Sequence, residues 1–147
     1  MGIAVTRTAR ASWQGTVPEG GGRIGLGSGA YEGAFTLKAR VSDVERSTNP
    51  EELIAAALAG CFTMSLADLL SESGHPAADL QTKARVRLEQ TDEGFRITKI
   101  ELRTTGRVPG IDAERFAELA RHAEATCPVS LALAGTQVTL EAAELES

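Results

Sequence analysis

The first part of the chain shows the two-residue alternation of apolar and polar side chains that is typical of half-buried strands. Over 35–41, which reads FTLKARV, apolar side chains fall on the odd positions, whereas Lys38 and Arg40 fall between them. The pattern predicts a strand here, with Arg40 pointing away from the buried face. Earlier strands are expected over 3–13 and 23–27, with a glycine turn at 20–22.

A long apolar segment follows, and it begins with clear helix signals. Asn49 can cap a helix, Pro50 suits the first helical position, and two acidic residues come next, at the positive end of the helix dipole. The helix is expected to end near Ser73, with Gly74 as its stop. Over 53–66 the side chains are apolar or small nearly all round, which predicts burial on every side. One small sheet cannot cover such a helix, so we expect a second copy of the chain to cover the rest.

The second half of the chain predicts a hairpin, a helix and a last strand. Alternating positions predict long strands over 80–91 and 95–102, joined by a turn at 92–94. A second helix is expected to begin near Asp112 and to carry one apolar stripe.

Pro128 is expected to end that second helix just after Cys127, since a residue before proline avoids helical geometry. A turn over 130–134 and a strand over 137–142 complete the pattern. The order βββ-α-ββ-α-β lacks the regular alternation of a parallel α/β sheet. It predicts an α+β fold, in which an antiparallel sheet packs on a long buried central helix within one domain, 1–147.

Composition and charge exclude several classes of protein. The 147 residues suit one soluble domain, with 42% apolar and 24% charged residues. The net charge is -5 and Lys or Arg runs are absent from the sequence, so we expect neither a nucleic-acid nor a membrane partner. No secretory signal precedes the first strand. The apolar run over 53–64 is broken at Thr63 and is too short to span a bilayer. We therefore expect a cytoplasmic protein.

The two cysteines are the strongest candidates for chemistry. Cysteine pairs in intracellular chains lean towards catalysis or metal binding. His75 and His122 complete a zinc set by number only, since no ligand spacing appears. Cys61 lies in the apolar helix and Cys127 closes the stripe of the second helix, so both thiols face the interior. The pair suits a peroxidatic and a resolving thiol. Plain core packing of two small residues stays an open alternative.

A peroxidatic thiolate needs a nearby cation, and Arg40 is a candidate with Glu51 as its carboxylate partner. The ordinary alternatives are a solvated strand residue and an acid at the helix dipole. Glu51 and Cys61 are ten residues apart, so one helix separates them by about 15 Å. If both serve one site, the carboxylate comes from a partner subunit.

The sequence resembles the OsmC/Ohr family of hydroperoxide peroxidases over nearly its whole length. The segment 48–62, TNPEELIAAALAGCF, is similar to the peroxidatic segment of the family, and 127–130, CPVS, to its resolving segment. The segments 94–100 and 108–113, GFRITKI and VPGIDA, resemble the OsmC branch rather than the Ohr branch.

The resemblance implies a peroxidatic role for Cys61 and a resolving role for Cys127. It implies that Arg40 activates the thiolate and that Glu51 orients this arginine, with Arg23 as the alternative arginine. It also implies an intertwined homodimer with both active sites at the interface. No metal, flavin or haem is required.

The predicted function is thiol-dependent reduction of organic hydroperoxides to alcohols, with an external thiol or dithiol restoring the enzyme, in oxidative or osmotic stress defence. An apolar pocket near Phe62 and Met64 is expected to favour organic peroxides. One alternative is a non-catalytic module that binds a small apolar ligand. Another is a redox sensor that oxidises once. A thioredoxin-like peroxidase is disfavoured, because no C-x-x-C is present.

Overall fold

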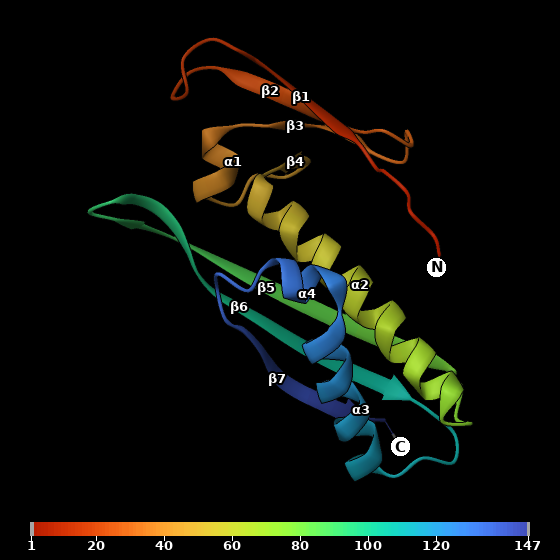
Figure 1. Ribbon diagram of the computed structural model, residues 1–147. Helices are drawn as coiled ribbons and strands as arrows, with labels where there is room; N and C mark the ends of the chain where they lie inside the picture. Colours follow the sequence, from red (N-terminus) through yellow and green to blue (C-terminus); the bar gives the residue numbers. More distant parts are fainter. Residues whose placement is uncertain (1, 147) are drawn as a thin grey trace. The chain divides into compact units, whose positions relative to one another are not determined.

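The computed structural model describes residues 2–146 and shows two compact units, Met1–Leu53 and Ile54–Ser147 (Figure 1). The fold is α+β, as predicted. Each unit has its own sheet, and each sheet contains antiparallel and parallel pairs. The prediction of an antiparallel sheet is therefore wrong, and the sheets are mixed. A single domain over 1–147 stays a prediction.

The first unit contains a four-stranded sheet in the order β1-β2-β3-β4. Strands β1 to β3 pair antiparallel, and β4 runs parallel to β3. The elements are β1 (Ala9–Gln14), β2 (Gly21–Leu26), β3 (Glu32–Phe35), α1 (Leu37–Val41) and β4 (Ser47–Thr48).

The predicted glycine turn at 20–22 lies partly inside β2, where Gly22 pairs with Trp13 on one side and Phe35 on the other. A Cβ at Gly22 would come within 2.6 Å of the Phe35 ring. The missing side chain lets the two aromatic rings approach to 5.3 Å between centroids. Such a tilted pair is a favourable aromatic geometry.

Arg40 lies on a short helix, α1, and the prediction of a strand over 35–41 is wrong beyond Phe35. Thr36 caps this helix, because its hydroxyl accepts a hydrogen bond from the Ala39 backbone N–H at 3.0 Å. The Asn49 side chain also donates to the Ala39 carbonyl at 3.0 Å. A local cap and a contact from ten residues away therefore override the alternating pattern.

The long helix α2 (Pro50–Glu72) has the predicted ends. Asn49 accepts a hydrogen bond from the Glu52 backbone N–H at 2.8 Å, which is the expected N-cap. Gly74 has a φ of +87°, the left-handed conformation that glycine adopts readily after a helix. The chain signals at both ends of α2 are thus confirmed.

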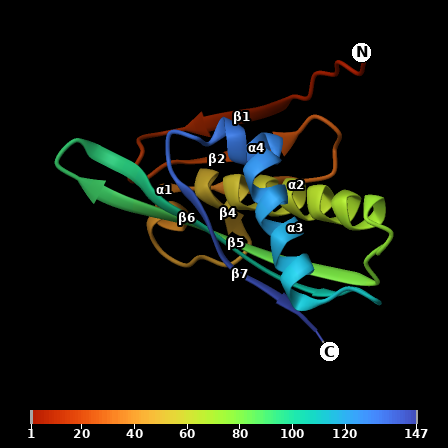
Figure 2. The same ribbon diagram turned by 60° about the horizontal axis from the view of Figure 1, so that its bottom comes forward.

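The second unit contains the rest of α2 and a three-stranded sheet in the order β5-β6-β7. Helices α2 and α3 lie on the same face of this sheet (Figures 1 and 2). The predicted hairpin is confirmed, with Thr91 paired to Gly94. The elements after α2 are β5 (Asp79–Thr91), β6 (Gly94–Arg107), α3 (Ala113–Thr126), α4 (Pro128–Ala132) and β7 (Val138–Leu145).

The core-facing side of α2 is a row of fully buried side chains at four-residue spacing. Burying each one stabilises the fold by about 1.5–3 kcal/mol relative to exposure. On the opposite side Met64 is 76% exposed, so a single copy does not bury α2 all round. Phe62 belongs to the core and has no exposed surface, and the apolar pocket expected near Phe62 and Met64 stays a prediction. The buried row is Leu58, Phe62, Leu66 and Leu70.

Strand β7 runs parallel to β6, because the chain crosses over through α3 and α4 before it returns. A parallel pair needs such a crossover. The predicted turn at 130–134 is wrong in its first part, which belongs to α4. Pro128 ends α3 as predicted, and it also occupies the first turn of α4, a position that proline favours.

By length and composition, α2 is able to cross a membrane, with a mean hydropathy of 1.9 over its most apolar part. The apolar stretch of the chain is therefore longer than the run over 53–64 on which the sequence prediction was based. Core helices of soluble proteins pass the same test, and the row at Leu58 to Leu70 packs against the β5–β7 sheet and α3.

Candidate active site

The two cysteine side chains meet inside the second unit. The Cys127 thiol donates a hydrogen bond to Cys61 Sγ at 2.8 Å, and both cysteines are free. A disulfide bond is about 2.05 Å long, so the sulfurs need to approach by less than about 1 Å to bond. The predicted approach of two interior thiols from different elements is present in the structure.

The two thiols differ in their access to solvent. Cys127 is fully buried, whereas Cys61 is half-buried at the edge of the core. Burial raises the pKa of the Cys127 thiol, and its hydrogen bond to Cys61 raises that pKa further. Backbone N–H groups of Ser130 and Val129 oppose the shift. Cys127 is therefore held in its protonated form, with its proton directed at the sulfur that solvent can reach.

Local sequence explains why Cys127 faces the core. Asp112 caps α3 by accepting a hydrogen bond from the Arg115 backbone N–H at 2.7 Å. From this fixed start, Phe116 and Ala123 carry the buried stripe along the helix to Cys127. The Cys127 backbone N–H donates to the Ala123 carbonyl at 2.9 Å, which holds it to the last turn of α3.

Arg40 and Glu51 form a two-pronged ion pair inside the first unit. Arg40 Nε and Nη2 donate to the two oxygens of Glu51, each at 2.9 Å. The hydrogen bond that Arg40 donates to Glu51 raises the pKa of Arg40 further above its already high value. Glu51 is only 7% exposed, and it lies in the first turn of α2. This geometry holds the guanidinium plane in one orientation, which a lysine does not reproduce.

Arg23, the alternative arginine, has a different environment. It lies on β2 with its side chain 58% exposed, and it pairs with Glu32 at 3.4 Å. Exposed pairs of this kind contribute little and constrain the side chain weakly. Of the two arginines, Arg40 is the one held in a fixed geometry by a buried carboxylate.

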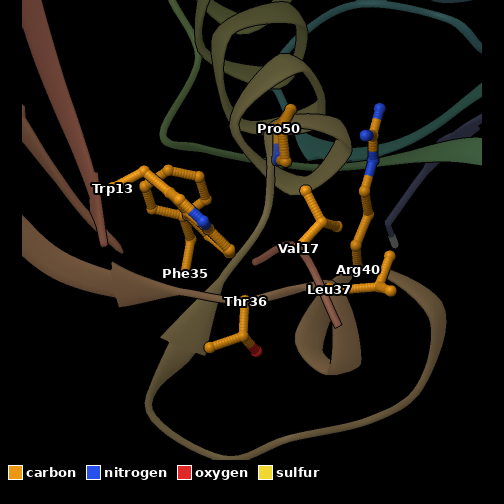
Figure 3. A pocket seen from close by; sticks show the side chains of 7 residues that line it. All are labelled: Trp13, Val17, Phe35, Thr36, Leu37, Arg40 and Pro50. Atoms are coloured by element: carbon orange, nitrogen blue, oxygen red, sulfur yellow. The ribbon is translucent and has the colours of Figure 1, made fainter. Parts of the chain in front are cut away.

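An apolar pocket of about 200 Å³ lies next to Arg40 in the first unit. Trp13 and Phe35 stand together on one wall, while Arg40 extends alongside the turn of α2 that begins at Pro50 (Figure 3). Its size suits a small apolar group rather than a drug-sized ligand, whose pockets hold about 300–1,000 Å³. The sequence interpretation missed Trp13 and Phe35, because their pairing depends on the register of three strands.

The structure thus groups the four predicted residues into two pairs, one in each unit. Cys61 and Cys127 belong to the second unit, and Arg40 and Glu51 to the first. Among residues 2–146, no group of three or more His, Cys, Asp or Glu side chains is placed to hold a metal ion. The fold carries a pair of thiols in contact and an oriented guanidinium. These are the groups that a thiol-based enzyme uses, because a reactive cysteine needs a nearby cation.

Comparisons with known proteins agree with that class. The family model described as OsmC-like protein matches residues 43–141. The peroxiredoxin OsmC of Escherichia coli K12 is 39% identical over 140 residues, covering 95% of this chain and 96% of the relative. The organic hydroperoxide resistance protein OhrA of Bacillus subtilis is 33% identical over 108 residues, 71% of this chain and 74% of the relative.

Solved structures show the same fold. An organic hydroperoxide resistance protein from Elizabethkingia anophelis superposes with a TM-score of 0.77 at 23% identity, covering 100% of both chains. The chain belongs to the OsmC/Ohr family, as its motifs indicated.

Proposed function

We propose that the protein is a thiol-dependent peroxidase that reduces organic hydroperoxides to alcohols. One observation carries the proposal: a half-buried Cys61 sulfur lies 2.8 Å from the buried thiol of Cys127. Peroxide can reach the first sulfur only, and the second is placed to react with its product. Relatives named as a peroxiredoxin and as a hydroperoxide resistance protein support the same activity.

The first step is attack of the Cys61 thiolate on the outer oxygen of the hydroperoxide. The O–O bond breaks, Cys61 becomes a sulfenic acid, and the alkoxide takes a proton to leave as the alcohol. In the second step the Cys127 sulfur attacks the Cys61 sulfur. An S–S bond forms, the S–O bond breaks, and water leaves with the Cys127 proton.

Arg40 is proposed to stabilise the thiolate and the peroxide oxygens, with Glu51 holding its orientation. Because Glu51 and Cys61 lie ten residues apart in α2, we propose that Arg40 and Glu51 of one subunit serve Cys61 of the partner subunit in a homodimer. The 76% exposure of Met64 on α2 supports the dimer, since a second copy would cover this apolar face. Size-exclusion chromatography with light scattering should give the dimer mass; a monomer at micromolar concentration would remove this arrangement.

An external thiol or dithiol is proposed to reduce the disulfide by exchange, in a cytoplasmic enzyme of oxidative or osmotic stress defence. We also propose that the apolar pocket at Trp13, Phe35 and Arg40 receives the organic group of the substrate. The enzyme should therefore have a higher kcat/KM for cumene hydroperoxide than for hydrogen peroxide. The opposite ranking of the two kcat/KM values would overturn the assigned preference.

The proposed reaction is tested by adding one equivalent of cumene hydroperoxide to the fully reduced protein. Intact mass and free-thiol measurements within seconds should show loss of both thiols and an intrachain Cys61–Cys127 disulfide. Cys61→Ser should leave the peroxide intact. Cys127→Ser should consume it and stop at the sulfenic acid or at a more oxidised product. Persistence of both thiols in the unmodified protein would refute the peroxidase.

The binding module is less well supported than the peroxidase, because two free sulfurs in contact have no role in it. A sensor would show the same first oxidation without multiple turnover, so steady-state assays with dithiothreitol or dihydrolipoamide as the reductant separate it from the enzyme.

A further inference from the structure

A chain of three threonine hydroxyls links α2 to the β5–β6 sheet within the second unit. Thr63 lies on α2, Thr82 on β5 and Thr104 on β6. Thr63 Oγ1 is 2.8 Å from Thr82 Oγ1, which is 3.1 Å from Thr104 Oγ1. Thr104 is fully buried. These hydroxyls form a polar connection in an otherwise apolar helix–sheet interface.

Counting protons shows that the three hydroxyls do not make all their contacts at once. The outer hydroxyls also contact backbone carbonyls, Ala59 at 2.7 Å from Thr63 and Gln81 at 3.1 Å from Thr104. Three hydroxyl protons serve four contacts, so one contact always lacks a proton. Thr63 is the donor in both of its contacts, so its single proton is shared between the Ala59 carbonyl and Thr82. Thr82 can donate to Thr104, and Thr104 donates to the Gln81 carbonyl. The shortest contacts of the chain, 2.7 and 2.8 Å, are nevertheless those of Thr63 on the helix.

Apolar packing alone leaves the rotation of α2 loosely defined. The buried row at Leu58 to Leu70 is flanked by apolar or small side chains, so a small rotation of the helix exchanges one apolar contact for another. Directional hydrogen bonds do not tolerate such a rotation, because they weaken steeply as their angles change. Thr63 therefore restricts the rotation of the helix that carries Cys61.

Small rotations matter for the thiol pair. Thr63 and Cys61 are about 200° apart around the helix axis, so the side chains point to opposite sides. A side-chain atom lies about 5 Å from the axis, so a 10° rotation moves the Cys61 sulfur by roughly 1 Å. This displacement is as large as the approach that the sulfurs need to form a disulfide.

We propose that Thr63, held by Thr82 and Thr104, is a positioning residue that fixes the Cys61 sulfur relative to Cys127 and so sets the speed of disulfide closure. The inference rests on the proposed peroxidase function. Thr63 acts on the second step, in which Cys127 attacks the Cys61 sulfenic acid, and not on the attack of Cys61 on the peroxide. A sulfenic acid that closes slowly is exposed to a second peroxide, which converts it to sulfinic acid.

The test compares Thr63→Val, which keeps the shape of the side chain but loses the hydroxyl, with Thr63→Ser, which keeps the hydroxyl. Reduced proteins receive a series of cumene hydroperoxide concentrations, and intact mass gives the ratio of disulfide to Cys61 sulfinic acid. Thr63→Val should lower the closure rate about 10- to 100-fold, the loss expected for a misplacement near 1 Å, and raise the sulfinic fraction. Thr63→Ser should restore the ratio.

Val86→Ala is the control for general loss of stability, because Val86 packs against the same core without a polar role. It should lower the unfolding midpoint without changing the ratio of products. An unchanged ratio in Thr63→Val, or an equal change in Val86→Ala, would overturn the positioning role. If the unmodified protein does not lose its Cys61 thiol to peroxide at all, the peroxidase itself fails, which is a separate result.

Discussion

The ion pair of Arg40 and Glu51 and the thiol pair of Cys61 and Cys127 differ in the kind of contact that joins the two side chains. Arg40 and Glu51 meet through two charged hydrogen bonds of 2.9 Å, in a geometry that no step of the proposed reaction has to change. Cys61 and Cys127 share one weak hydrogen bond of 2.8 Å between sulfurs, and in the proposed cycle this contact becomes a covalent bond and opens again at every turnover. The charged pair gains from rigidity, whereas the thiol pair needs accurate placement together with freedom to move.

The strongest asymmetry lies within the thiol pair, because only Cys61 is open to solvent. We predict that an external thiol attacks the disulfide at Cys61 and releases Cys127, so that a mixed disulfide forms on Cys61 alone. The oxidised protein is mixed with a monothiol, quenched with acid, alkylated and mapped by peptide mass. An adduct found on Cys127 would mean that the burial seen here does not govern the exchange.

The charged pair is tested by changing geometry while keeping charge. Arg40→Lys removes the fork that Glu51 holds, and we expect kcat/KM for cumene hydroperoxide to fall about 10- to 100-fold, the loss typical of a misplaced catalytic group. The matched control is Arg23→Lys, since Arg23 is exposed and pairs with Glu32 through one contact. An equal loss in both variants, or a larger one in Arg23→Lys, would reassign the activating arginine.

The rate of disulfide closure should depend on pH in a direction set by Cys127. Burial raises its pKa, so at neutral pH a smaller fraction of Cys127 is thiolate than in a free cysteine. The closure rate should climb about tenfold per pH unit and level off only above the ordinary thiol range near 8.5. Stopped-flow fluorescence after one equivalent of peroxide measures it. A plateau already reached at pH 7 would contradict the protonated state assigned to Cys127.

The smallest expected effect compares two helix caps. Asn49→Ala and Asp112→Ala each remove an N-cap, and each should cost about 1 kcal/mol of stability in urea unfolding. Asn49 also donates to Ala39 on the helix that carries Arg40. Only Asn49→Ala should therefore lower kcat/KM as well. Equal kinetic losses in the two variants would show that general stability explains the effect.

The parts of the fold that could be predicted were those with short-range causes. Asn49 and Pro50 defined the start of α2, Gly74 its end, and Asp112 the start of α3, since each acts on the backbone within a few residues. The helix at Arg40 has one short-range signal, the cap at Thr36, but its other support is a hydrogen bond from Asn49 to the Ala39 carbonyl across ten positions, which the sequence pattern does not reveal.

The parallel direction of β7 has a signal in the order of the elements. A strand, a helix and a strand in succession form a crossover unit, which favours parallel pairing. The prediction of an antiparallel sheet followed the hairpin pattern, which the first three strands do adopt. For the candidate site, the sequence indicated two interior thiols, but their 2.8 Å separation depends on the packing of α2 against α3 and α4, which no local pattern encodes.

The orientation of Cys127 depends on the residue that follows it, Pro128. Cys127 is both the C-cap of α3 and the N-cap of α4, and the break between the two helices depends on a proline that disfavours helical geometry in the residue before it. A single nucleotide change that replaces this proline would let the two helices fuse and turn the thiol to a new direction. Within a population, loss of the chemistry would then arise without a change at either sulfur and without loss of the core, so a survey of natural variants should score position 128 together with the cysteines.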